Sequence, residues 1–227
     1  AIIGILYGGL VAMVQTDLKK LVAYSSVSHL GFVVLGTFAL DPTALQGALY
    51  QMLSHGISTG ALFVLAGMLY DRRHTYEMRE YGGVATPTPV LAAFFLCASL
   101  ASAGLPMLNG FVGEFLILAG TFQRHPAWAA CAAAGVIVSA VYLLWAYQRV
   151  FFGGVTVERN LSLADTDARE KLILVALAFM ILWMGIGSAG FTRRSEASTR
   201  NTLELMKRPG AYNAATPAAP PPAAADM

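Results

Sequence analysis

One carboxylate inside a long apolar stretch constrains the fold of this chain more than any other residue. The stretch runs from Pro89 to Phe122 and contains a single acidic residue, Glu114. A run of this kind indicates a membrane span, and a charged side chain near the bilayer centre costs about 2.5–3.5 kcal/mol even on the lenient insertion scale. We therefore expect Glu114 to have a buried partner, water or a role in moving ions. The alternative is a kinked helix in which Glu114 caps the second half or faces a lipid headgroup.

The same stretch is too long for one straight helix, because about 20 residues suffice to cross the hydrocarbon core. Gly104, Pro106 and Gly110 lie in its middle, and both residue types interrupt helices. Unwound backbone at membrane depth is tolerated where it is buried in protein or lines a wet cavity, as in the discontinuous helices of transporters. The sequence thus predicts two half-helices joined by an unwound segment, with Glu114 following it.

Composition indicates a membrane protein as well. Charged residues make up 12% of the chain and apolar residues 56%, whereas soluble domains average about 25% charged residues. The net charge of +2 and the lack of a basic run argue against a nucleic-acid partner. Cys97 and Cys131 lie in apolar stretches and are expected to act as small hydrophobic residues rather than as a disulfide or metal ligands. No phosphate-binding loop, dinucleotide fingerprint or metal-ligand spacing is present, so we expect no cofactor in this chain.

The hydropathy pattern predicts an all-α polytopic membrane protein with about six transmembrane helices, one of them broken in mid-membrane. The predicted spans are Ala1–Gln15, Leu21–Leu40, Ala44–Tyr70, Pro89–Phe122 (the broken one), Trp128–Phe152 and Leu172–Phe191. Residues 1–191 would form the membrane domain. Residues 192–227 are polar and then rich in Pro and Ala, and we expect this tail to be disordered.

Basic residues gather in alternate loops between the predicted spans, and this distribution predicts how the chain is oriented in the membrane. One side carries Lys19, Lys20, Arg72, Arg73, Arg79, Arg149, Arg159, Arg169 and Lys171. The opposing short loops carry only Arg124, so the positive-inside rule assigns the basic side to the cytoplasm. The basic residues of the tail argue weakly for the opposite orientation; they are Arg193, Arg194, Arg200, Lys207 and Arg208.

Two other spans carry polar patches at helical spacing. The third span contributes Gln51, His55, Ser58 and Thr59, and the second contributes Tyr24, Ser25, Ser28 and His29. Histidine exchanges protons near neutral pH, and hydroxyl and amide groups can order water, so His29 and His55 are candidates for a proton path. The alternative is that these groups only hydrogen-bond between helices and hold the bundle together. Lys19, at the start of the second span, would ordinarily extend toward the headgroups.

Three segments resemble a known family. They are Q-T-D-L-K-K-L-V-A-Y-S-S-V-S-H-L-G-F (Gln15–Phe32), S-H-G-I-S-T-G-A-L-F (Ser54–Phe63) and N-G-F-V-G-E-F (Asn109–Phe115). Together they look like the antiporter-like membrane subunits of respiratory complex I. The resemblance is closest to the type called subunit M, or chain 4 in mitochondria, because the broken helix carries Glu114 where the sister subunits and related cation antiporters typically have lysine. Thr59 also stands where the subunit L pattern has a lysine.

The resemblance implies roles for four residues. Glu114 would be the proton-exchanging group, His55 and His29 would belong to the central hydrophilic axis, and Lys19 would belong to the shared D-L-K motif. NADH, FMN, Fe-S clusters and quinone would be held by other subunits of the complex. The resemblance also implies that this chain is the second of two inverted repeats plus a terminal helix, lacks the earlier half, and does not pump alone.

We therefore expect a proton-translocating membrane subunit of NADH:quinone oxidoreductase, in a multi-pass form in the bacterial inner (plasma) membrane. Its partners would be the lipid bilayer, protons and the other membrane subunits of complex I. A subunit of a cation/proton antiporter, or of a membrane-bound hydrogenase relative, is the alternative. A structural scaffold with a vestigial channel is the third hypothesis. Glutamate at position 114 favours the first over the second, and the continuous polar axis argues against the third.

Overall fold

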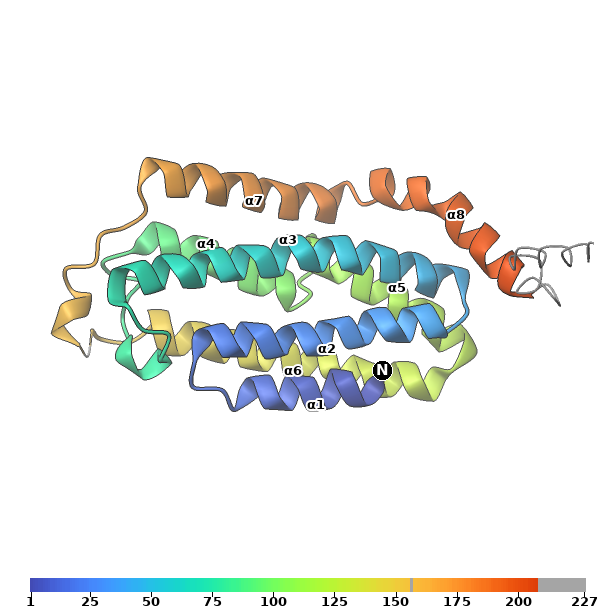
Figure 1. Ribbon diagram of the computed structural model, residues 1–227, viewed down its shortest axis with the longest axis horizontal. Coiled ribbons are helices and arrows are strands. Elements are labelled where there is room, and N and C mark those ends of the chain that lie inside the picture. The colour runs from blue at the N-terminus through green and yellow to red at the C-terminus, as the bar shows by residue number, and fades with distance from the viewer. Residues whose placement is uncertain (156, 208–227) are drawn as a thin grey trace, which may run out of the picture.

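The computed structural model describes residues 1–155 and 157–207, which are helical apart from their connections (Figure 1). The α-helices are α1 (Ile2–Met13), α2 (Leu18–Phe38), α3 (Pro42–Arg73), α4 (Pro89–Ser102), α5 (Asn109–Arg124), α6 (Pro126–Phe151), α7 (Ala168–Ile186) and α8 (Ala189–Lys207). Two short 3-10 turns, η1 (Met78–Glu80) and η2 (Glu158–Asn160), lie in the connections. The predicted all-α class is confirmed.

Not all predicted spans are equally long. In the described residues, α2, α3 and α6 are each long and apolar enough to cross a membrane alone. Helices α7 and α8 meet the same criterion only together, as a pair bent by 64°. Helices α1 and α4 are apolar but shorter. Length and composition therefore support three to four candidate spans, and α1 and the α4–α5 pair lie at the positions of the other two predicted spans.

The predicted interruption of the fourth span is confirmed, because α4 and α5 are separate helices. Gly104 turns the chain after α4 with φ of 79°, in the left-handed region that favours glycine. Pro106 lies in the unwound segment, as expected. Gly110 lies instead inside the first turn of α5, where a Cβ atom would overlap the carbonyl oxygen of Ala101. Gly110 therefore permits close packing of the two half-helices and does not end either of them.

Aspartate side chains explain where three of the helices begin. Asp17 accepts a hydrogen bond from the backbone N–H of Lys20 at the start of α2 (2.8 Å). Asp41 accepts from two backbone N–H groups at the start of α3, where proline occupies the first turn. Asp167 and Glu170 form a reciprocal capping box at the start of α7. Each cap satisfies backbone donors that have no partner inside the helix.

Helices α1 to α7 run along a common direction, α8 bends away from it, and α3 lies next to α2, α4, α5 and α7 (Figure 1). A cluster of buried apolar side chains joins α2, α3, α4, α6 and α7. Its members include Leu62, Leu65, Phe95, Tyr142 and Phe151, each at most 2% exposed. Many outward-facing side chains are large and apolar, as expected for helices whose outer surface faces lipid or other membrane subunits.

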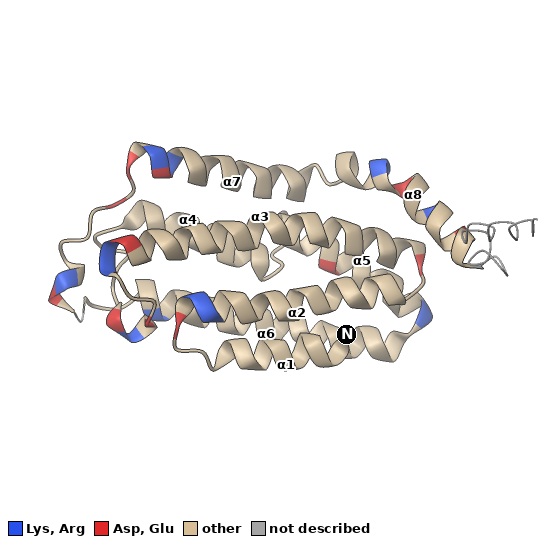
Figure 2. Ribbon diagram, in the orientation of Figure 1, with Lys and Arg blue, Asp and Glu red and all other residues tan. Residues whose placement is uncertain are grey.

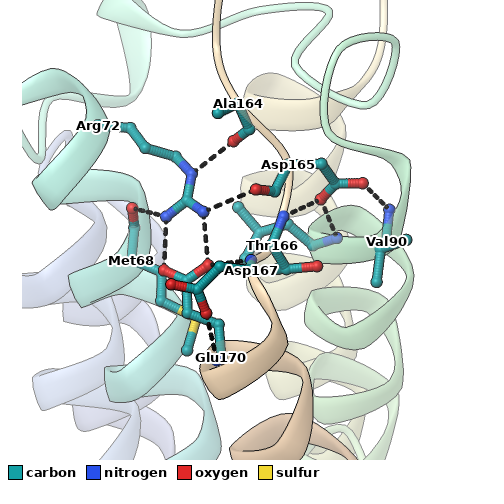
Figure 3. Close-up of polar contacts among 9 residues, drawn as sticks. Met68, Arg72, Val90, Ala164, Asp165, Thr166, Asp167 and Glu170 are labelled. Atoms are coloured by element: carbon teal, nitrogen blue, oxygen red, sulfur yellow. Dashed lines mark hydrogen bonds and ion pairs between the residues drawn. The ribbon is translucent and has the colours of Figure 1, made fainter.

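Charged residues gather mainly at the ends of the helix bundle (Figure 2). At one end Arg72 joins α3 to α7 and to the connection before it (Figure 3). Its guanidinium donates to both carboxylate oxygens of Glu170, at 2.9 and 2.6 Å. It also donates to the carbonyl oxygens of Met68, Ala164 and Asp165. The Asp165 carboxylate accepts from the backbone N–H groups of Val90 and Leu91 at the start of α4. One arginine thus organises three elements at this end.

The C-terminal part differs from the sequence-based expectation. Helix α7 stops at Ile186, and α8 covers the first part of the segment that was expected to be a disordered tail. Helix α8 packs on α3, where Gln46 donates from Nε2 to the carbonyl oxygen of Thr192 (2.7 Å). One face of α8 is covered, and Leu203 is only 4% exposed. The spans were predicted from continuous runs of apolar residues, and a polar helix with one buried face contains no such run. The Pro- and Ala-rich part, residues 208–227, lies outside the described residues.

Candidate functional site

Glu114 lies in the second turn of α5, close to the break, and is 3% exposed. Its Oε1 atom lies 2.8 Å from Nδ1 of His29 on α2 and accepts a hydrogen bond from Nε2 of Gln51 on α3 (3.2 Å). The N-terminal cap of α5 is Leu108, which makes no side-chain cap. Glu114 therefore neither caps the half-helix nor faces a headgroup. It has the buried partners that a carboxylate at this depth requires.

Both ring nitrogens of His29 have side-chain partners. The Nδ1 atom faces Glu114, and the Nε2 atom lies 3.3 Å from the hydroxyl of Tyr142 on α6. His29 is 1% exposed and Tyr142 is fully buried. Sequence reasoning did not single out Tyr142. Its only signal was a hydroxyl group within an apolar span, and nothing in the spacing of α6 indicated which residue it would meet.

His55 lies beside His29, with the two ring centroids 5.5 Å apart. The hydroxyl of Thr59 is 3.1 Å from Nδ1 of His55 and 3.3 Å from its Nε2. The polar stripe predicted on α3 therefore lies along the centre of the bundle, from Gln51 at Glu114 to Thr59. The two rings lie close together, and both nitrogens of His29 are already occupied, by Glu114 and by Tyr142.

The patch predicted on α2 is divided by the packing. Tyr24 is 41% exposed and points out of the bundle. Ser28 donates to the carbonyl oxygen of Ile5 on α1 (2.7 Å), which is the helix-holding role that we considered as the alternative. Only His29 from this patch reaches the Glu114 carboxylate.

Lys19 lies apart from this buried group. It occupies the first turn of α2 and is exposed, and its Nζ atom lies 5.3 Å from the centre of the Tyr76 ring. Ten residues of helix separate it from His29, a distance of about 15 Å at the usual rise. The structure therefore brings Glu114, His29 and His55 together and leaves Lys19 at the end of the bundle.

Several buried polar atoms on α3, α4 and α5 lack a hydrogen-bond partner within the described residues. They are Oε2 of Glu114, Oε1 of Gln51, Oδ1 of Asn109, and the hydroxyls of Ser54, Ser99, Ser102 and Thr121. A cavity of about 100 Å³ adjoins Glu114 and is lined by Gly104, Phe111, Phe115, Leu118 and Val136. Of these atoms only Oε2 belongs to a residue that lines the cavity, and the cavity is large enough for a water molecule beside it.

Gly104 shapes this cavity. A Cβ atom at that position would stand 3.1 Å from Oε2 of Glu114. The break in the helix thus brings a residue without a side chain to the free oxygen of the carboxylate. This leaves Oε2 open on the side away from His29.

No group of three or more His, Cys, Asp or Glu residues in the described part of the chain could hold a metal ion. Cys97 and Cys131 are free thiols. The site consists of titratable and hydrogen-bonding side chains alone. A buried carboxylate and two histidines beside a broken helix, in a bundle with helices long and apolar enough to cross a membrane, define a class of protein, namely polytopic membrane proteins with a discontinuous helix.

Comparison with known proteins specifies the class further. Residues 1–141 match the model of the family described as NADH:quinone oxidoreductase/Mrp antiporter, transmembrane. The chain belongs to this family, as its motifs predicted. Subunit M of the NADH-quinone oxidoreductase of Rhodobacter capsulatus is 47% identical over 184 residues, which cover 81% of this chain and 36% of that protein.

Solved structures show the same relationship. A chain of respiratory complex I from Thermus thermophilus, with bound NADH, matches with a TM-score of 0.85 and 36% identity, over 91% of this chain and 44% of that one. The Mrp complex from Dietzia sp. DQ12-45-1b matches with a TM-score of 0.79 at 20% identity, over 93% of this chain and 47% of that one. The second likeness shows the fold alone. The chain thus spans less than half the length of the relatives that it matches.

Proposed function

We propose that this chain is part of a proton-translocating membrane subunit of NADH:quinone oxidoreductase, of the subunit M type. Membership of the family and the likeness to subunit M support the assignment. The observation that carries it is the buried contact between Glu114 and His29, 2.8 Å long and closed to solvent on both sides. A carboxylate so placed is stable only with a partner that can share or return its proton.

The contacts suggest how a proton would move. When Glu114 is ionised, the Nδ1–H group of His29 donates to its Oε1 atom, and Nε2 of a neutral His29 accepts from the hydroxyl of Tyr142. A second proton reaching Nε2 would make His29 a cation, which the Glu114 carboxylate stabilises. Transfer of the Nδ1 proton to Oε1 then leaves two neutral groups. Loss of that proton from the carboxyl group, after it rotates toward the cavity, would complete the passage.

His55 would supply the proton to Nε2 of His29 by way of the Tyr142 hydroxyl, or of a water molecule that takes its place, and Thr59 would orient the His55 ring. Moving one charge through the membrane field costs about 2.3 kcal/mol per 100 mV, which no group in this site provides. In the proposed complex this energy comes from electron transfer from NADH to quinone. NADH, FMN, Fe-S clusters and quinone would lie in other subunits, and the other membrane subunits would be the partners of this chain.

The basic end of the bundle would face the cytoplasm, by the positive-inside rule. We propose the bacterial inner (plasma) membrane as the location. The chain would act together with the half of the protein that corresponds to the uncovered part of its relatives, as the second inverted repeat with a terminal helix.

The test is the substitution Glu114→Gln in the full-length subunit of the assembled complex. Because the glutamine has the same size but does not titrate, we expect near-normal assembly and proton pumping lowered by at least about tenfold. Glu114→Asp should keep part of the activity. The measurement is NADH-driven acidification of sealed inverted vesicles, with assembly scored on a native gel. Glu204→Gln, an exposed carboxylate on α8, is the matched control. Full pumping by Glu114→Gln would disprove the assignment.

A cation/proton antiporter subunit is the second candidate, and the likeness to the Mrp complex is a likeness of fold. The glutamate at position 114 favours the oxidoreductase. Neighbouring reading frames decide between them, because companion complex I subunits are expected only in the first case.

A further inference from the structure

A cavity of about 580 Å³ lies far from Glu114, at the end of the bundle where α6 stops. Its walls come from the connection around η1 and from the last turns of α6 and the residues that follow. Its lining side chains are the polar Arg79, Gln148 and Arg149, the large apolar Met78, Trp145 and Phe152, and Tyr81, whose hydroxyl donates to the carbonyl oxygen of Thr75. The cavity is open at the surface, and its volume is within the range of about 300–1,000 Å³ that small-molecule sites occupy.

The cavity carries positive charge without acidic lining residues. The Arg149 guanidinium lies 4.6 Å from the centre of the Trp145 ring, and no carboxylate of the described residues forms an ion pair with it. Arg79 is 74% exposed and makes one ion pair, with Glu77 at 3.5 Å. Its charge is therefore partly offset and that of Arg149 is not. Paired guanidinium groups are suited to phosphate, because each can donate two parallel hydrogen bonds.

The backbone of the wall is fixed before any ligand arrives. The N–H groups of Gly82 and Val84 donate to the carbonyl oxygen of Val150, and those of Gly83 and Ala85 donate to Phe152 and Phe151. These bonds satisfy the last carbonyl groups of α6, which otherwise carry the negative end of the helix dipole. An anion beside Arg149 therefore meets less repulsion than at an uncapped helix end.

The depth of the cavity indicates the source of the phosphate. Arg149 lies in the last turn of an apolar helix of 26 residues, and Trp145 lies one turn before it. Tryptophan followed by a basic residue at a span end is the pattern of the membrane interface, where phospholipid headgroups lie. The apolar wall of Trp145, Phe152 and Met78 suits the upper part of an acyl chain. A free phosphate ion would make no favourable contact with these apolar side chains.

We propose that this cavity binds the headgroup of an anionic phospholipid, with Arg149 and Arg79 on the phosphate and the apolar wall against the chain. The site goes beyond proton transfer and does not depend on it, since lipid binding is measured without any pumping.

The experiment uses the assembled complex with the full-length subunit, in nanodiscs containing a photoactivatable phosphatidylglycerol. Crosslinked peptides are identified by mass spectrometry. We expect labelling of the peptides around residues 78–82 and 145–154. The double substitution Arg149→Gln and Arg79→Gln should reduce it about tenfold, because it removes the charge-assisted hydrogen bonds to the phosphate. Arg159→Gln is the control, because Arg159 is basic and exposed on the same side but does not line the cavity.

Three results would overturn the proposal. Equal labelling by a phosphatidylcholine probe with the same chains would mean general lipid contact. Loss of labelling on adding millimolar inorganic phosphate would mean a site for free phosphate. Absence of labelling in a complex that assembles normally on a native gel would mean that another subunit covers the cavity. Arg149→Lys keeps the charge but not the two parallel hydrogen bonds, so intermediate labelling by that variant supports direct contact with the phosphate.

Discussion

Removing Arg72 should loosen the end of the bundle without affecting the centre. The Arg72 and Glu170 side chains are 13% and 10% exposed, and they are joined by two hydrogen bonds (Figure 3). Breaking a fully buried pair costs about 3–5 kcal/mol. Some water reaches this pair, so we expect Arg72→Gln to cost about 2–3 kcal/mol of local stability. The backbone carbonyl of Asp165, whose carboxylate caps α4, would also lose its hydrogen bond from Arg72.

The assay is amide hydrogen exchange of the assembled complex, read by mass spectrometry. Since about 1.4 kcal/mol corresponds to a factor of ten, the amides of Val90, Leu91 and Glu170 should exchange about 30 to 100 times faster in Arg72→Gln. The matched control is Arg200→Gln, whose pair with Glu196 is 2.8 Å long, against 2.6 Å for Arg72 and Glu170, but 69% and 48% exposed. An exposed pair contributes at most about 1 kcal/mol, so exchange near it should change less than about fivefold. Equal changes in the two variants would refute the reasoning from burial.

Four further substitutions, at Tyr142, His55, Thr59 and Gly104, test the centre of the site. Tyr142→Phe removes only the hydroxyl that faces His29, so pumping should fall several-fold at normal assembly. Tyr147→Phe, at a ring that contacts the rings of Phe95, Phe151 and Phe152, should leave pumping unchanged, and equal rates in both variants would remove Tyr142 from the path. His55→Ala should lower pumping more than it lowers assembly, and Thr59→Val should have the same effect to a smaller degree. If the complex is lost on a native gel while its surviving fraction pumps normally, these residues only hold the helices together. Gly104→Ala should cost about 1–2 kcal/mol of stability because its backbone is left-handed, and it should lower pumping because the new Cβ atom displaces the Glu114 carboxylate. Gly67→Ala, with nothing within 4 Å of the added Cβ atom, should be neutral. Normal pumping by Gly104→Ala would show that the cavity beside Oε2 is not used.

Local chemistry accounts for what the sequence predicted well. Two energetic costs are the same in any fold. An uncompensated charge in hydrocarbon is unfavourable, which predicts the apolar runs and the need of Glu114 for buried partners. Proline removes a backbone donor from a helix, which predicts the break around Gly104 and Pro106. The helical spacing of Gln51, His55 and Thr59 likewise predicts a shared face before any neighbour is known. The motif resemblance then added the family.

Tertiary packing decided which polar groups meet. Tyr24 and His29 lie on the same predicted patch, yet Tyr24 is exposed and His29 contacts Glu114, because α3, α5 and α6 pack against His29. Tyr142 became a partner of His29 only through the placement of α6 against α2. Helix α8, in the segment expected to be disordered, was not predicted for the same reason. Its buried face exists only where α3 lies beside it. Periodicity determines the face of a helix on which a side chain lies, but contacts between residues as distant in sequence as His29 and Glu114 depend on how the helices pack.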